Sequence, residues 1–216
     1  MAHDYVGQGS RSDLTAVKVA ILEGKSKKDL YNDHFESMVK YHAGIAKAIN
    51  VLQPPKRVAG RYALDAFAAQ PRGWERIPAE SLRARLIVLT GPSGIGKTQF
   101  ALAHFENPLF VSHMDQLGKL EGGDYDGIIF DDMSFSHLPR EARIHLCDLE
   151  FDRQFHIRYT TALLPAGLPR ILTTNKSIEE VLFKPDEDHK DKAILRRIHV
   201  IKLDVDEEDE IEEFDQ

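Results

Sequence analysis

The sequence predicts an α/β fold with a central, mostly parallel β-sheet, preceded by a small all-α unit. Apolar residues recur at helical spacing up to residue 52, a proline-rich stretch follows, and from Arg85 short apolar runs alternate with helical segments. Alternation of strands and helices is typical of a parallel sheet. The chain has 216 residues, of which 42% are hydrophobic, and this is enough to bury a core.

Residues 1–52 are expected to form the helical unit, with about three helices. Gly24 interrupts the first helix, and Ser26 with Asp29 has the spacing of a capping box that starts a second. Pro54 stops the pattern. The apolar positions that share helical spacing are Leu14, Val17 and Ile21, followed by Phe35, Met38, His42, Ile45, Ile49 and Leu52.

Residues 53–84 are interpreted as a linker or collar. They include a short helical segment at residues 62–69. Breakers of regular structure surround that segment, namely Pro54, Pro55, Pro71, Gly73 and Pro78.

Residues 85–203 are expected to form the α/β domain. Five apolar runs of strand length are predicted to build its sheet, at residues 86–89, 109–111, 127–130, 170–172 and 199–201.

The net charge of −7 is unevenly distributed. Residues 204–216 hold nine acidic side chains and no basic one, so removing them leaves +2 for residues 1–203. We expect an acidic, disordered tail, since such blocks are usually solvated. The alternative is that the tail competes with DNA phosphates for a basic surface.

Nothing in the sequence indicates a membrane span or a signal peptide. We therefore expect a soluble, intracellular protein without a membrane partner. The single cysteine, Cys147, lies among apolar residues and has no second cysteine to pair with, so we interpret it as a buried core thiol.

A glycine-rich segment follows the apolar run at 86–89. It matches the pattern G-x-x-x-x-G-K-[ST] in the strand–turn–helix context that a phosphate-binding loop requires. We expect Lys97 to contact the β- and γ-phosphates of ATP and the Thr98 hydroxyl to bind Mg²⁺. A chance glycine turn is the alternative. The predicted ATP-binding residues are Gly91, Pro92, Ser93, Gly94, Ile95, Gly96, Lys97 and Thr98.

Two acidic residues end the apolar run at 127–130. We expect Asp131 to hold Mg²⁺ through water and Asp132 to act as the general base for the attacking water. The alternative is a solvated turn after a strand.

Asn175 ends the apolar run that begins at Arg170. We expect its amide to contact the γ-phosphate or to position the water, although a strand-terminal Asn is also an ordinary turn former.

The basic pair Arg196-Arg197 lies between a helical segment and a strand. One of the two is expected to reach a neighbouring subunit's γ-phosphate, which would require an oligomer. The alternative is a helix-end or surface cation.

Residues 151–159 alternate apolar with basic or polar side chains, as a hairpin strand does. Basic groups that follow a phosphate backbone, together with a ring that stacks on bases, would bind single-stranded DNA. An ordinary hairpin surface is the alternative. The candidate DNA contacts are Arg153, His156, Arg158, Tyr159 and, from a glycine-rich loop at 117–123, Lys119.

These motifs, in this order, resemble the compact superfamily 3 helicases. More narrowly, residues 7–14 (Gly-Gln-Gly-Ser-Arg-Ser-Asp-Leu), residues 39–45 and Arg158-Tyr159 look like the replication-initiator (Rep) proteins of small circular single-stranded DNA viruses and related plasmids. The resemblance extends to about residue 203. It implies an AAA+/RecA-like P-loop ATPase that unwinds DNA as a hexamer in rolling-circle replication, moving 3′ to 5′ on single-stranded DNA.

The resemblance also implies partners. Residues 1–52 would be an oligomerisation domain, so that a homo-hexamer forms through these helices and the ATP-site interface. The family's HUH endonuclease carries His-hydrophobe-His and Tyr-x-x-Lys motifs, and this sequence contains neither. We therefore expect that domain elsewhere in the full-length protein. The protein would act in the host nucleus if the virus infects eukaryotes, and otherwise in the cytoplasm.

Two other classes remain open. The loop also resembles that of guanylate kinase, although a kinase would begin near its loop, and here about 85 residues precede it. The other class is a nucleotide-dependent DNA-binding scaffold with little turnover.

Overall fold

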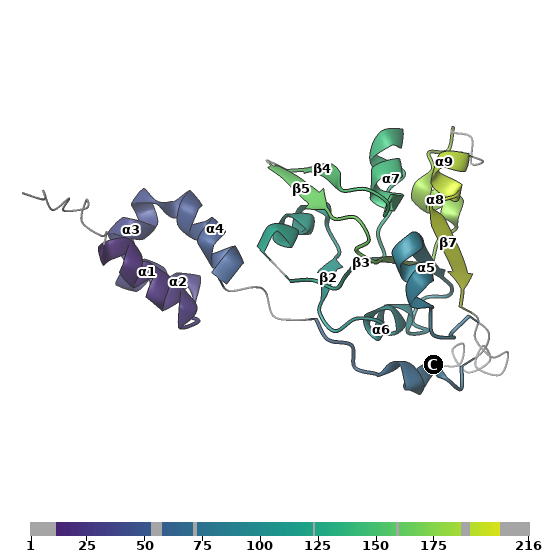
Figure 1. Ribbon diagram of the computed structural model, residues 1–216, viewed down its shortest axis with the longest axis horizontal. Coiled ribbons are helices and arrows are strands. Elements are labelled where there is room, and N and C mark those ends of the chain that lie inside the picture. The colour runs from purple at the N-terminus through teal and green to yellow at the C-terminus, as the bar shows by residue number, and fades with distance from the viewer. Residues whose placement is uncertain are drawn as a thin grey trace, which may run out of the picture. The chain divides into compact units, whose positions relative to one another are not determined.

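A computed structural model describes residues 12–52, 58–70, 73–122, 124–158, 160–186 and 191–203. The chain divides into two compact units, Met1–Lys56 and Arg57–Gln216 (Figure 1). Tyr159, the acidic tail and the segment before Ser12 lie outside the described residues.

The first unit is helical. Its elements are α1 (Ser12–Leu22), α2 (Lys27–Asp33), α3 (Phe35–Lys40) and α4 (His42–Leu52). The predicted capping box is present, because the Ser26 hydroxyl accepts from the Asp29 N–H and the Asp29 carboxylate accepts from the Ser26 N–H. The helices enclose a small apolar core of Val17, Ala20, Ile21, Leu30, Met38 and Ile45.

The described part of this unit has four helices, and the expectation of about three is corrected. The backbone leaves the helical region at His34 (φ −134°) and Tyr41 (φ −120°). Neither break carries a glycine or a proline, and the apolar spacing continues across both.

The second unit has a five-stranded, all-parallel sheet, so the predicted P-loop α/β fold with a central parallel sheet is confirmed. The strand order is β2-β3-β6-β1-β7. The strands are β1 (Leu86–Thr90), β2 (Pro108–Val111), β3 (Gly127–Asp131), β6 (Arg170–Thr174) and β7 (Ile198–Lys202).

Both faces of the sheet are buried. Leu86 and Val88 of β1 point into one apolar cluster, and Ile87 and Leu89 point into the other. The first cluster is covered by η2 (Met114–Gly122), α7 (Arg140–Cys147), α8 (Ile178–Leu182) and α9 (Lys192–Leu195), and the second by η1 (Leu64–Phe67), α5 (Ala79–Ala84) and α6 (Lys97–Leu102).

Cys147 lies in the first cluster, as the sequence predicted for a core thiol. Burial raises the pKa of its thiol to about 12, so the group stays protonated at neutral pH.

The described part of residues 53–84 is a packed portion of the second unit rather than a free connector. Phe67, Trp74, Ile77 and Leu82 are buried in the second cluster. The Phe67 and Trp74 rings stack with centroids 5.6 Å apart, and both meet Phe100 edge-on. The prolines in this stretch favoured its interpretation as a linker or collar, so the burial of Phe67 and Trp74 was not predicted.

The basic segment at 151–159 forms one arm of a hairpin that is separate from the main sheet. Strand β4 (Arg153–Ile157) pairs antiparallel with β5 (Thr160–Leu164). Phe155, Ala162 and Leu164 face the first cluster, whereas Gln154, His156 and Leu163 are exposed. The partner strand β5 was not predicted.

Candidate functional site

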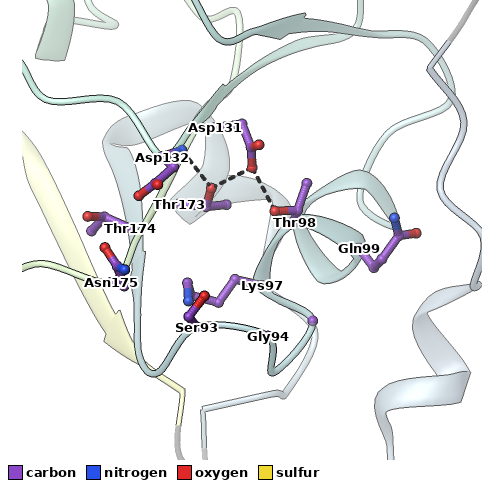
Figure 2. Close-up of a pocket in the computed structure, with 11 residues that line it drawn as sticks. Ser93, Gly94, Lys97, Thr98, Gln99, Asp131, Asp132, Thr173, Thr174 and Asn175 are labelled. Carbon is purple, nitrogen blue, oxygen red and sulfur yellow. Dashed lines mark hydrogen bonds between the residues drawn. The ribbon is translucent and has the colours of Figure 1, made fainter.

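A cavity of about 260 Å³ lies where β1, β3 and β6 end. The glycine-rich loop joins β1 to α6 on one side of it, and the residues that follow β3 and β6 form the other side (Figure 2). Its lining residues are Ser93, Gly94, Gly96, Lys97, Thr98, Gln99, Asp131, Asp132, Thr173, Thr174 and Asn175.

Glycines are required at particular places in the loop. Gly96 caps α6 with a φ of +99°, a conformation that side chains with a Cβ rarely adopt. At Gly91 a Cβ atom would lie 2.6 Å from the carbonyl oxygen of Leu203. These constraints hold the loop in a tight turn between strand and helix.

Lys97 is the buried cation of the cavity. Its side chain is 9% exposed, and its ammonium group donates to the carbonyl oxygens of Gly91, at 2.9 Å, and Pro92. Burial lowers the pKa of Lys97, while the charges of Asp132 and Asp131 act in the opposite direction. A phosphate would provide the ammonium group with charged acceptors in place of neutral carbonyls.

Thr98 and Asp131 place two oxygen atoms side by side. The Thr98 hydroxyl donates to Oδ1 of Asp131 at 2.6 Å, and the Thr173 hydroxyl donates to the same atom at 2.9 Å. Asp131 and Thr173 are register partners on β3 and β6, so the parallel pairing itself sets this contact.

These oxygens fit a magnesium ion. Mg²⁺ prefers hard oxygen ligands and usually takes only one or two from the protein, with phosphate and water completing its shell. Within the described residues there is no cluster of three or more His, Cys, Asp or Glu that could hold a metal by itself. Thr98 and Asp131 therefore suit a metal that arrives with a nucleotide.

Asp132 and Asn175 lie on the opposite side of the cavity from the loop (Figure 2). Asp132 has a φ of +49°, unusual for a residue with a side chain, and its N–H donates to the Thr173 carbonyl at 3.0 Å. Residues in sparsely populated backbone conformations cluster at functional sites. Asn175 is exposed at the end of β6.

The structure brings most of the predicted nucleotide-site residues to one cavity. Three predicted loop residues do not line it: Gly91 and Pro92 contribute carbonyl oxygens to Lys97, and Ile95 packs against the second cluster. Gln99, Thr173 and Thr174 line the cavity but were not predicted. Strand pairing could have identified Thr173, since it is the residue of β6 opposite Asp131.

The two arginines of the basic pair have different surroundings, and neither lines the cavity. Arg197 is half-buried, donates to the Ala193 carbonyl at 2.8 Å and lies 3.7 Å from the Asp148 carboxylate. The Arg196 side chain is exposed and makes no hydrogen bond or ion pair with another described residue. The geometry therefore favours Arg196 as the group presented outward.

The candidate DNA contacts also divide. His156 and Arg158 are exposed on the hairpin, and Lys119 is exposed on η2. The turn is fixed to η2, since the Arg158 N–H donates to Asp115 at 3.0 Å. Arg153 is only partly exposed, because its guanidinium binds the buried Asp148 through Nε, at 3.0 Å, and Nη2. We propose a structural role for it, and its contact with DNA stays a prediction.

No family model matches the sequence. The chain is 25% identical over 200 residues to the replication-associated protein of Canary circovirus, an alignment that covers 89% of this chain and 56% of the relative. The predicted resemblance to viral replication-associated proteins is confirmed. The chain thus spans little more than half the length of this Rep relative.

Solved structures give weaker similarities. The JCV helicase is 17% identical with a TM-score of 0.37, covering 89% of this chain and 52% of its own. NtrX from Brucella abortus, in complex with ADP, is 14% identical with a TM-score of 0.37, covering 91% of this chain and 50% of its own. Scores of this size do not establish a common fold. Among the described residues, no helix has both the length and the apolar character needed to cross a membrane.

Proposed function

We propose that the protein is an ATP-dependent helicase or translocase that acts on single-stranded DNA in the replication of a small circular genome. One observation carries the proposal: Lys97, Thr98, Asp131, Asp132 and Asn175, from three different strand ends, line one cavity. A cation, two adjacent metal-binding oxygens, a carboxylate and an amide are the groups that ATP hydrolysis requires.

The loop and Lys97 bind the nucleotide in this mechanism. Lys97 exchanges the carbonyls of Gly91 and Pro92 for the β- and γ-phosphate oxygens. Thr98 and Asp131, the latter through water, would hold Mg²⁺, and the ion would supply positive charge against the phosphates. The Thr98–Asp131 hydrogen bond holds the two side chains in place before the nucleotide arrives.

Asp132 and Asn175 act on the attacking water. Asp132 accepts a proton from the water while the water oxygen bonds to the γ-phosphorus. The bond between the γ-phosphorus and the bridging oxygen breaks, and ADP leaves. The Asn175 amide orients the water or the γ-phosphate. Asp132 is held in position by the hydrogen bond of its N–H to Thr173.

Arg196 completes a neighbouring subunit's site. Its exposed position outside its own cavity supports a role in trans, and an arginine stabilises the negative charge that spreads over the phosphoryl group in the transition state. The functional unit is then an oligomer, for which the resemblance to Rep proteins suggests a hexamer.

The helical unit supports assembly. Several large apolar side chains of α1 and α3 are exposed on a unit with a small core, among them Val19, Leu22, Phe35 and Val39. We propose that these residues contribute to contacts between subunits.

The hairpin binds single-stranded DNA in this scheme. Lys119, His156 and Arg158 present basic or polar groups around its turn, and Tyr159 is retained as a stacking candidate from its sequence position. Movement 3′ to 5′ and a role in rolling-circle replication follow from the resemblance to Rep proteins alone.

ATP hydrolysis, measured with and without single-stranded DNA, tests the function. We expect stimulation by DNA, and we expect Lys97→Ala to lower hydrolysis by about 100-fold or more while the protein remains folded. Unwinding retained by Lys97→Ala would disprove the assignment. Phosphate transfer to GMP would instead indicate a nucleotide kinase, and nucleotide binding with no DNA-stimulated turnover would indicate a scaffold.

A further inference from the structure

Asp148 is a buried carboxylate between the end of α7 and the start of the hairpin. Its side chain is 2% exposed, and its Oδ1 accepts from the Glu150 N–H at 3.0 Å. Carboxylates are rarely buried without partners of opposite charge. The groups around Asp148 come from elements that are far apart in the sequence.

The first partner belongs to the hairpin. Arg153, the first residue of β4, donates from Nε and Nη2 to Oδ2 of Asp148. The guanidinium also lies over the Phe151 ring, 5.5 Å from its centroid. The base of the hairpin is thus held by the carboxylate, while His156 of β4 and Arg158, which follows β4, are exposed.

The second partner belongs to the segment that carries the proposed trans-acting arginine. Nη2 of Arg197 lies 3.7 Å from Oδ2 of Asp148. Arg196 is the adjacent residue, at the C-terminal cap of α9. Asp191, at the other end of α9, caps the helix and binds Arg140 of α7 at 2.6 Å. Helix α7 contacts both α9 and β4 (Figure 1).

The third contact involves the strand that ends in the cavity. Arg170, fully buried at the start of β6, donates from Nη1 to the Asp148 carbonyl at 2.9 Å and to the Leu146 carbonyl at 2.7 Å. The same strand ends in Thr173 and Thr174, and Asn175 follows. Asp148 therefore contacts the hairpin, the segment that follows α9, and β6, the strand that ends at the nucleotide site.

The charges make this junction sensitive to the loss of the carboxylate. The Asp148 carboxylate lies next to the guanidinium groups of Arg153 and Arg197, and its charge also acts on the buried guanidinium of Arg170. Burial alone would raise the pKa of Asp148, but the hydrogen bonds of Arg153 and Glu150 and the charges of both arginines outweigh burial and hold it below its usual value. Removing one partner of a buried ion pair leaves the others uncompensated.

We propose that Asp148 is a positioning residue that couples DNA binding at the hairpin to the placement of Arg196 at the neighbouring ATP site. DNA that shifts the hairpin would shift Arg153 and, through the shared carboxylate, Arg197 and Arg196. This inference rests on the proposed function, and it assigns the link between the two sites to one side chain.

The test measures ATP hydrolysis by the full chain with and without single-stranded DNA for the wild type and Asp148→Asn. We expect the DNA-dependent increase in kcat to fall by about fivefold or more. The affinity for a fluorescent ATP analogue should not change, because no cavity residue is altered. An Asp148→Asn protein with the wild-type increase overturns the inference, whereas a wild type without any increase counts against the proposed function.

A double-mutant cycle separates coupling from simple destabilisation. Combining Asp148→Asn with Arg153→Gln or Arg197→Gln should reduce stimulation no further than Asp148→Asn alone, and losses that multiply contradict a shared junction. Asp126→Asn is the control, because Asp126 is an exposed carboxylate that accepts from the N–H groups of Glu106 and Asn107, neither of which belongs to the hairpin. It should lower Tm without reducing stimulation.

If Asp148→Asn does not fold, the single variants Arg153→Gln and Arg197→Gln provide the test. Each must reduce the stimulation of ATP hydrolysis by DNA, and normal stimulation in either overturns the inference.

Discussion

The Thr98 hydroxyl donates a hydrogen bond of 2.6 Å to Oδ1 of Asp131, and this bond joins the first turn of α6 to the end of β3. Both side chains are also proposed to hold Mg²⁺, Asp131 through water. We expect Thr98→Ala to lower kcat by about 100-fold, because it removes a metal ligand and the partner that orients Asp131. Thr98→Ser keeps the hydroxyl and should retain most activity, as measured by phosphate release over a range of Mg²⁺ concentrations. Equal loss in both variants would argue against the metal role.

Substitutions of Arg196 and Arg197 should have different effects. Arg196→Ala is expected to lower kcat by about 10³-fold with no change in Tm or nucleotide affinity, as removal of a trans-acting arginine does. Arg197→Ala should instead lower Tm, since Arg197 binds the Ala193 carbonyl and lies next to Asp148.

Mixing subunits provides the control for a role in trans. Lys97→Ala and Arg196→Ala subunits are each expected to have little activity alone. Mixed together they should regain part of the activity, because each supplies what the other lacks. No recovery in mixed oligomers would place Arg196 outside the neighbouring site.

Arg158→Ala should weaken DNA binding. Losing one phosphate contact reduces the slope of log K against log salt concentration by about one unit and lowers affinity on any sequence. Fluorescence anisotropy of a labelled oligonucleotide over a salt series measures both. Arg83→Ala is the charge-matched control, because Arg83 is exposed on α5, on the opposite face of the sheet. An equal loss of DNA affinity in both variants would indicate a general effect of charge rather than a DNA contact at the hairpin.

Trp74 tests whether the stretch before β1 is part of the second unit. Its ring is 3% exposed and stacks on Phe67, so Trp74→Ala should lower the free energy of unfolding by about 3–5 kcal/mol. Tyr62 is 54% exposed and meets Phe67 only edge-on, so Tyr62→Ala should cost about 1 kcal/mol or less. Urea denaturation of both variants makes the comparison, and equal small effects would favour a free linker.

His104 should make the second unit sensitive to acid. Its Nδ1 lies 2.8 Å from the Phe100 carbonyl and its Nε2 accepts from the Ile77 N–H at 3.1 Å, an arrangement that requires a neutral ring. Burial lowers the pKa of His104 below 6.5, so the unfolded chain binds the proton more readily. This contribution is fully present above about pH 6.5 and is lost as the pH falls through the folded pKa. A Tm series over pH should be flatter for His104→Gln, and an unchanged slope contradicts the assignment.

The fold was predictable where local pattern determines structure. Four of the five sheet strands, β1, β2, β3 and β6, are short and mostly buried apolar runs, and the loop glycines occupy positions where a Cβ is disfavoured, so both leave a signal in the sequence. The breaks at His34 and Tyr41 leave none, because the residues around them are compatible with a continuous helix.

The sequence predicted which residues belong to the site, but not which side chains form ion pairs or hydrogen bonds with one another. Arg153, Arg158, Arg196 and Arg197 are alike in the sequence, and the fold separates them by bringing Asp148 next to two of them. Such contacts depend on tertiary structure, and residue type and spacing do not report them. Thr173 was missed for the same reason, since its importance lies in facing Asp131 across two strands.

The central position of β1 in the sheet determines how fast its backbone amides exchange hydrogen with solvent. The strand that leads into the loop is paired on both sides, by β6 and β7, and four of its five residues are fully buried. Its amides should open to hydrogen exchange only when the whole unit unfolds. The hairpin is a two-stranded ribbon outside the main sheet and should exchange far sooner. We therefore expect a slowly exchanging anchor for the nucleotide loop, joined to a lightly protected arm that carries the proposed DNA contacts.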